Sequence, residues 1–180
     1  AYYQNAGEPN PVSDSWTVSF VQGGPQLPAS ITVDSLASWT DFAGDEYKAF
    51  SGTAVYTTTI DKVPVADVIK LDLGFVAENA SVYLNGDYIG TVIDSPYQLY
   101  IPAEKFKGQD ELVVRVANSM ANRIAYMDKK GVDWKIFYNV NMSARKKENV
   151  KNGIFDASDW EPKSSGLLGP VTLTPAMVKQ

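Results

Sequence analysis

SVYLNGDYIG, residues 81–90, contains two short alternating runs that meet at Asn85-Gly86. A two-residue type I′ turn needs positive φ at both central positions, and Asn followed by Gly adopts those angles at little cost. The stretch therefore predicts a β-hairpin. Its expected cross-strand pairs are Val82 with Ile89 and Tyr83 with Tyr88.

The same alternation extends on both sides of the hairpin. Apolar residues at every second position predict strands near residues 16–20, 51–60, 68–73, 112–116 and 171–173. Six to nine such strands, separated by Gly and Pro turns, are typical of an all-β antiparallel sandwich or barrel. The side chains expected inside are Val82, Leu84, Ile89, Ile69, Leu71, Leu73, Leu112, Val114 and Val116. Short helical turns are expected only near residues 34–41 and 103–106.

Length and composition limit the function classes. A chain of 180 residues with 44% apolar residues suits one packed domain, and no apolar run approaches the roughly 20 residues of a membrane span. A net charge of -5 argues against a nucleic-acid partner. Because the chain has no Cys and no His, it lacks thiolate nucleophiles, disulfides and the commonest general base.

The chain divides into a leading segment and one domain. Residues 1–15 are polar and contain two prolines, so we expect a linker there and a β-sandwich over residues 16–180. The first residue is not Met, and no signal peptide is evident. An excised piece of a longer protein and a mature secreted chain both fit this beginning.

Residues 123–165 break the alternating pattern. Loops of this length are usually functional or disordered, and this one is too aromatic for a disordered linker. Its middle is also rich in Lys and Arg. We expect an ordered excursion from one end of the sandwich, in which residues 134–141 could add a strand pair.

Carboxylates are the candidates for catalysis and for metal binding. Glycoside hydrolysis needs a facing pair, but the candidate pairs all lie in polar turns or on a surface alternation, where a solvated carboxylate is expected: Asp45/Glu46, Asp110/Glu111 and Asp156/Asp159. No catalytic residue is therefore assigned. Asp41, Asp45 and Glu46 could hold a structural calcium ion, the alternative being an exposed acidic loop. No other cofactor is expected.

Aromatic side chains outside the strands suggest a different function. Sugar rings stack on Trp and Tyr, while their hydroxyls pair with amide and guanidinium groups. Loops at one end of a sandwich can bring such groups together. The candidate binding residues are Trp39, Tyr97, Asn118, Asn122, Arg123, Trp134 and Trp160. The alternative is that the tryptophans only cap the core.

Several motifs occur in an order typical of one family: WTVSF at 16–20, LASW at 36–39, FSGTAVY at 50–56, NSMANRI at 118–124 and SGLLGPVTL at 165–173. With the hairpin, they resemble the C-terminal domain of glycoside hydrolase family 106, the α-L-rhamnosidases, and the sugar-binding domains of family 2. The resemblance implies a galactose-binding-like jelly roll in a bacterial secreted, periplasmic or cell-surface protein. In that family the catalytic carboxylates lie in a separate barrel domain.

Three functions follow from this reading. The first is a non-catalytic accessory domain of a larger, α-L-rhamnosidase-like enzyme of polysaccharide degradation, with carbohydrate and the catalytic domain of the same chain as partners. The second is a free-standing carbohydrate-binding or adhesive surface module. The third, an intact small hydrolase, is opposed by the missing His and by the lack of a facing carboxylate pair.

Overall fold

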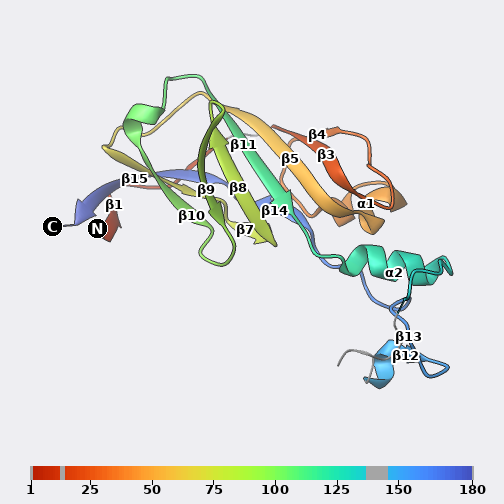
Figure 1. The fold of residues 1–180 in the computed structure, drawn as a ribbon. Helices are drawn as coiled ribbons and strands as arrows, with labels where there is room; N and C mark the ends of the chain where they lie inside the picture. Colours follow the sequence, from red (N-terminus) through yellow and green to blue (C-terminus); the bar gives the residue numbers. More distant parts are fainter. Residues whose placement is uncertain (1, 13–14, 137–145, 180) are drawn as a thin grey trace.

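The computed structural model describes residues 2–12, 15–136 and 146–179 (Figure 1). Its two main sheets are antiparallel throughout. One has six strands, in the order β4 (Ile31–Val33), β3 (Trp16–Gly24), β5 (Ser51–Ile60), β11 (Asp110–Ala117), β8 (Asn79–Leu84) and β9 (Asp87–Val92). The other has five, in the order β1 (Tyr2–Asn5), β15 (Thr172–Lys179), β6 (Val68–Asp72) and β10 (Gln98–Pro102), with β2 (Asn10–Pro11) also pairing with β15.

Smaller elements complete the chain. Two short pairs are β7 (Phe75–Ala77) with β14 (Gly166–Gly169) and β12 (Val150–Lys151) with β13 (Ile154–Phe155). The helices are α1 (Asp45–Ala49) and α2 (Ala121–Lys129), with single 3-10 turns at η1 (Trp39–Asp41), η2 (Ala103–Lys105) and η4 (Lys147–Asn149). In the described part of the chain, no helix is long and apolar enough to cross a membrane.

The core lies between the two main sheets, as the alternation predicts. Side chains of both sheets form one buried cluster, and eight of the nine residues expected inside belong to it. The exception is Ile89, which is half-buried at the edge of the cluster. Lys70 and Asp72 stay partly exposed between their buried neighbours, because successive side chains of a strand point to opposite faces. The prediction of an all-β antiparallel sandwich is confirmed.

The Asn85-Gly86 hairpin has the predicted turn but a different register. Both turn residues have positive φ, 52° and 84°, and Tyr83 pairs with Tyr88. Beyond that pair a bulge shifts the ladder, so Val82 pairs with Gly90. Ile89 is therefore the extra residue of the bulge, and its predicted pairing with Val82 is wrong.

The segment predicted as a linker, residues 1–15, contributes two strands instead. β1 pairs with the last four described residues of β15, and β2 pairs with the beginning of β15. The Tyr3 ring also stacks on Tyr100 of β10 at 4.2 Å between centroids. The linker prediction is wrong for these residues, since the free edge of β15 supplies partners that the polar sequence alone does not reveal.

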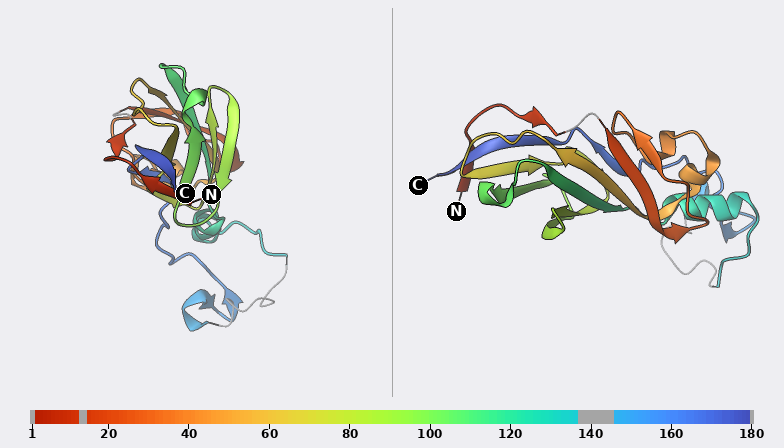
Figure 2. Two further views of the ribbon diagram at one scale, coloured as in Figure 1. Left: turned by 90° about the vertical axis from the view of Figure 1, so that its left-hand side faces the viewer. Right: turned by 90° about the horizontal axis from the view of Figure 1, so that it is seen from above.

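The long excursion leaves one end of the sandwich, as expected, but it begins with a helix. β11 leads directly into α2, which projects together with the small β12–β13 hairpin away from the end where the chain termini lie (Figures 1 and 2). We predicted a weakly periodic loop here, and α2 corrects that. Of the strand pair considered for residues 134–141, residues 134–136 form no strand, and residues 137–141 lie outside the described residues.

Asp110, the first residue of β11, connects two turns through hydrogen bonds. Its buried carboxylate accepts hydrogen bonds from the Asn85 side chain (2.6 Å) and from the backbone N–H groups of Lys107 (2.8 Å) and Gly108 (3.0 Å). Burial alone would raise the pKa of Asp110. The hydrogen bonds from Asn85, Lys107 and Gly108, with the nearby Lys107 charge, outweigh burial and lower this pKa below its ordinary value.

Replacing this carboxylate should remove a pH-dependent part of the stability. Asp110→Asn turns one acceptor oxygen into a donor that faces N–H groups, so we expect the free energy of unfolding at pH 7 to fall by about 1–3 kcal/mol. A lowered pKa stabilises the fold above the unfolded-state value of about 3.9 and stops doing so as the pH falls through the folded-state value. The gap between wild type and variant in urea titrations should therefore narrow below about pH 4. The exposed Asp61→Asn should change stability by less than about 0.5 kcal/mol at either pH. A gap that stays constant from pH 7 to the acid range would contradict this account.

Gly166 is a position where only glycine fits. Its φ is +106°, and an added Cβ would meet the Tyr56 hydroxyl and approach Cε3 of Trp39 to 2.8 Å. We expect Gly166→Ala to lower the free energy of unfolding by more than about 3 kcal/mol. Gly86→Ala, at φ +84° with no atom near the new Cβ, should cost only about 1 kcal/mol. Equal melting temperatures for the two variants would rule out the crowding at Gly166.

Candidate functional site

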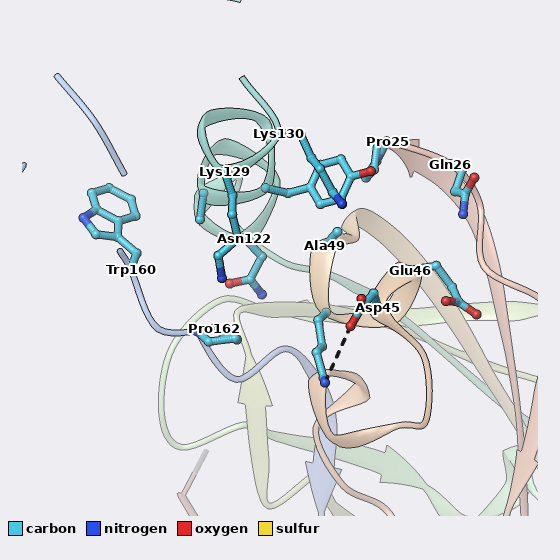
Figure 3. Close-up of a pocket in the computed structure, with 13 residues that line it drawn as sticks. Pro25, Gln26, Asp45, Glu46, Ala49, Asn122, Lys129, Lys130, Trp160 and Pro162 are labelled. Atoms are coloured by element: carbon cyan, nitrogen blue, oxygen red, sulfur yellow. Dashed lines mark ion pairs between the residues drawn. The ribbon is translucent and has the colours of Figure 1, made fainter. Parts of the chain in front are cut away.

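A hollow of about 320 Å³ lies at the end of the sandwich from which α2 projects. Its walls come from α1, from α2 and from the chain returning to the sandwich at residues 160–162 (Figure 3). The lining side chains combine two aromatic rings, three lysines, two carboxylates and two amides: Tyr126, Trp160, Lys48, Lys129, Lys130, Asp45, Glu46, Gln26 and Asn122. Pro25, Ala49, Ala125 and Pro162 complete the lining.

The wall formed by α2 is fixed by two asparagines that meet at Ser165. Asn122 donates from Nδ2 to the Lys163 carbonyl (2.9 Å) and to the Ser165 hydroxyl (3.3 Å), and its Oδ1 accepts from the Lys163 N–H (2.8 Å). Asn118 donates to the same hydroxyl at 2.9 Å and to the Phe50 carbonyl at 3.1 Å. These amides are thus engaged within the chain. They position the walls of the hollow and leave ligand contacts to other groups.

Arg123 also packs inward. Its backbone N–H donates to the Ser51 hydroxyl, and its guanidinium lies over Gly24, where an added Cβ would come within 2.8 Å of Cζ. The Nε atom is buried without a hydrogen-bond partner. Because Arg123 does not line the hollow, the structure gives it a packing role between α2 and β3.

The outer part of the excursion is organised around one buried carboxylate. We call residues 131–136 and 146–160 the appendage. Asp128, 1% exposed at its side chain, accepts from the Trp134 indole (2.7 Å), from the Lys135 ammonium (2.6 Å) and from the Ala157 N–H (2.8 Å). Both segments of the appendage, residues 131–136 and 146–160, therefore form hydrogen bonds with Asp128 near the C-terminal end of α2.

Two of the candidate tryptophans form the small aromatic core of the appendage. Phe155 lies edge-on to Trp134 at 6.5 Å and to Trp160 at 5.8 Å between ring centroids. The Trp160 indole donates to the Asn149 side chain at 2.9 Å. Trp160 remains half-exposed and lines the hollow, whereas Trp134 does not.

Two other candidates lie elsewhere. Trp39 is fully buried, with Phe20 and Phe50 each 5.6 Å from its ring, so it caps the core and offers no face to a sugar. Its assignment to the platform is wrong, because a residue outside the strands still faced the core. Tyr97 is half-buried against Phe75 at 6.3 Å and does not line the hollow.

The acidic residues considered for calcium do not form a metal site. Asp45 pairs with Lys48 at 3.8 Å across one turn of α1, and the Glu46 carboxylate lies close to Gly44 at the beginning of that helix. Asp41 does not line the hollow. Among the residues that the structure describes, no group of three or more Asp or Glu side chains could hold a metal ion. The prediction that Asp41, Asp45 and Glu46 could hold a calcium ion is therefore wrong.

Sequence reasoning missed the residues that α2 contributes to the hollow. These are Tyr126, Lys129 and Lys130, which join Asn122 and Ala125 at positions i, i+3, i+4, i+7 and i+8. This spacing is that of one helix face. The spacing is present in the sequence, but a polar helix face carries no apolar periodicity to mark it as a helix.

The hollow can bind a ligand by contact and charge. Tyr126 and Trp160 supply ring faces, Gln26 supplies an amide, and the lysines supply ammonium groups. Lys130 lies over the Tyr126 ring at 5.8 Å from its centroid, within the range of a cation–π contact. Such a set of aromatic and polar groups is typical of a non-covalent small-molecule or sugar site.

The described residues form a small β-rich domain, and nearly the whole chain is similar to a segment of much larger proteins. A rhamnosidase of known structure from Novosphingobium sp. PP1Y is similar to this chain with a TM-score of 0.70 and 27% identity, over 98% of this chain and 15% of the rhamnosidase. A protein of Formosa agariphila that carries a provisional β-glucuronidase name is 30% identical, over 92% of this chain and 16% of its own length. The chain thus spans about a sixth of the length of these relatives. No model of a protein family matches it.

The Asp128 cluster gives a local prediction. Asp128→Asn removes the negative charge that pairs with the Lys135 ammonium group. It also places an amide N–H₂ against the Trp134 indole N–H or the Ala157 backbone N–H, both of which are donors. Breaking such a buried pair typically costs about 3 kcal/mol, which corresponds to roughly a hundredfold faster hydrogen exchange where the loss is local. We expect that acceleration at the backbone amides of residues 146–160, with exchange in β5 and β11 unchanged. Asp133→Asn, an exposed change in the same segment, is the matched control. Uniform acceleration throughout the sandwich would show that the appendage is not a separate unit.

Proposed function

We propose that this chain is a non-catalytic accessory domain of a larger glycoside hydrolase and that it binds carbohydrate in the hollow beside α2. The observation that carries the proposal is that nearly the whole chain matches about a sixth of a rhamnosidase and of a β-glucuronidase-like protein. A segment of that size accompanies a catalytic domain and does not replace it. The partners proposed are carbohydrate and the catalytic domain of the same parent chain.

The lining of the hollow supports the carbohydrate part of the proposal. Tyr126 and Trp160 come from different segments, α2 and the returning chain, and both present partly exposed rings to the same space. Rings of this kind bury the apolar face of a sugar, while Gln26 and the lysines can pair with its hydroxyls. The hollow lies at one end of the sandwich, and loops gathered at such an end can bring residues from distant parts of the sequence together.

The more specific role follows from the same relatives. We propose an α-L-rhamnosidase-like parent that acts in polysaccharide degradation outside the cytoplasm of a bacterium. The similarity to the Novosphingobium rhamnosidase supports that choice, because it is accompanied by the motif order from WTVSF to SGLLGPVTL.

A glycan array probed with the 180-residue chain tests the carbohydrate part. We expect selective binding to a subset of bacterial, algal or plant glycans. Trp160→Ala and Tyr126→Ala should each weaken that binding by about tenfold or more, since one stacked ring contributes on the order of 1–2 kcal/mol.

Tyr2→Ala provides the matched control. Tyr2 is 83% exposed and belongs to β1, which lies at the opposite end of the sandwich (Figure 1), so its replacement removes an exposed ring that does not line the hollow. Circular dichroism confirms folding of each variant. Full binding by both hollow variants would move the site elsewhere, and absence of binding to every glycan would leave only the accessory role within the parent enzyme.

A further inference from the structure

Charge is unevenly distributed along this acidic chain. Residues 121–163 hold nine of the 16 Lys and Arg residues but only six of the 21 Asp and Glu residues. This segment, α2 and the appendage included, is therefore net positive, although the chain as a whole carries -5. A local excess of cations on an acidic protein is a feature that folding itself does not require.

Within the hollow, both carboxylates lie on the α1 side. Asp45 pairs with Lys48 at 3.8 Å, and the carboxylate of Glu46 lies near Gly44 at the start of α1. Opposite them, Lys129 and Lys130 are exposed at the end of α2. Among the described residues neither lysine forms an ion pair, whereas Lys135 and Lys151 of the appendage do.

These two ammonium groups stand beside the aromatic faces. Lys130 lies over the Tyr126 ring, and Lys129 and Lys130 line the same hollow as Trp160 (Figure 3). A ligand that fills the hollow therefore meets ring faces together with two ammonium groups that form no ion pair among the described residues. A neutral sugar would use the first and leave the second without a partner.

We propose that the hollow takes an acidic saccharide, a sugar ring that carries a carboxylate or a sulfate. The anionic group pairs with Lys129 and Lys130, while the ring lies against Tyr126 and Trp160. This inference rests on the proposed function and adds the chemical class of its ligand. The acidic remainder of the domain opposes long nucleic acids, so the positive charge serves an anion that fits at one end of the sandwich.

The test compares matched polysaccharides at low ionic strength with the whole 180-residue chain. Polygalacturonate supplies carboxylates, dextran sulfate supplies sulfates, and dextran is the neutral reference. We expect at least one acidic polymer to bind about tenfold more tightly than dextran, with an affinity that falls as salt is added. The polymer that binds identifies which anionic group the hollow accepts.

Variants separate the hollow from the general charge of the protein. The Lys129→Gln/Lys130→Gln pair should weaken binding of the acidic polymer by roughly three- to tenfold, as expected for two partly exposed charge contacts. The pair Lys62→Gln/Lys105→Gln removes two exposed lysines that do not line the hollow and should leave affinity within about twofold. Tyr126→Ala should weaken binding of the saccharide but not any binding of poly-L-glutamate.

Each contrary result has a distinct meaning. Equal affinity for dextran and for both acidic polymers, unchanged in Lys129→Gln/Lys130→Gln, would overturn the acidic class and leave carbohydrate binding in place. Poly-L-glutamate bound as tightly as the acidic saccharides, with no effect of Tyr126→Ala, would show that charge alone is recognised and would overturn the inference. No binding to any saccharide would remove the proposed carbohydrate function together with this inference.

Discussion

The arrangement of the site depends on the hydrogen bonds of Ser165. Its hydroxyl accepts from two side-chain amides, those of Asn118 at the end of β11 and of Asn122 in the first turn of α2. The backbone N–H of Ser165 donates to Ser38 Oγ, and the Ser165 carbonyl accepts from the Trp39 N–H. One buried residue therefore joins the departure of the excursion, its return and the segment before α1. All three walls of the hollow begin from this junction.

A second centre, around Asp128 near the other end of α2, organises the appendage. The sandwich core consists of aliphatic and aromatic side chains from both sheets, whereas the appendage is held by a few of its own rings and by the buried Asp128 carboxylate of α2. A polar centre of this kind is stable only while all of its partners are in place. The site thus has one wall, α1, on a rigid scaffold and another, Trp160, on a smaller unit.

The sequence predicted the sandwich well because alternation is a strong signal when one face of each strand is buried. It predicted the Asn85-Gly86 turn for the same kind of local reason, the backbone angles that these two residues tolerate. The bulge at Ile89 and the pairing of β1 with β15 depend on the neighbouring strands, so no local pattern could reveal them. For the site, two of the seven candidate binding residues, Trp160 and Asn122, line the hollow, whereas the candidate Trp39 is buried in the core. The sequence shows Lys129 and Lys130 only as part of a basic stretch. In the structure they lie at the C-terminal end of α2, and both line the hollow.

The position of Trp160 has a thermodynamic consequence. Because its ring belongs to the appendage but faces the hollow, any ligand that contacts the ring binds only those molecules in which the appendage is ordered. Ligand concentration and local order are then linked: a ligand at a hundred times its dissociation constant would add about 2.7 kcal/mol to the stability of the appendage. The reverse also holds, since any change that loosens the appendage lowers the fraction of molecules that are competent to bind. Under the proposed function, affinity at this end of the domain would therefore be set partly by residues, such as Asp128, that do not line the hollow.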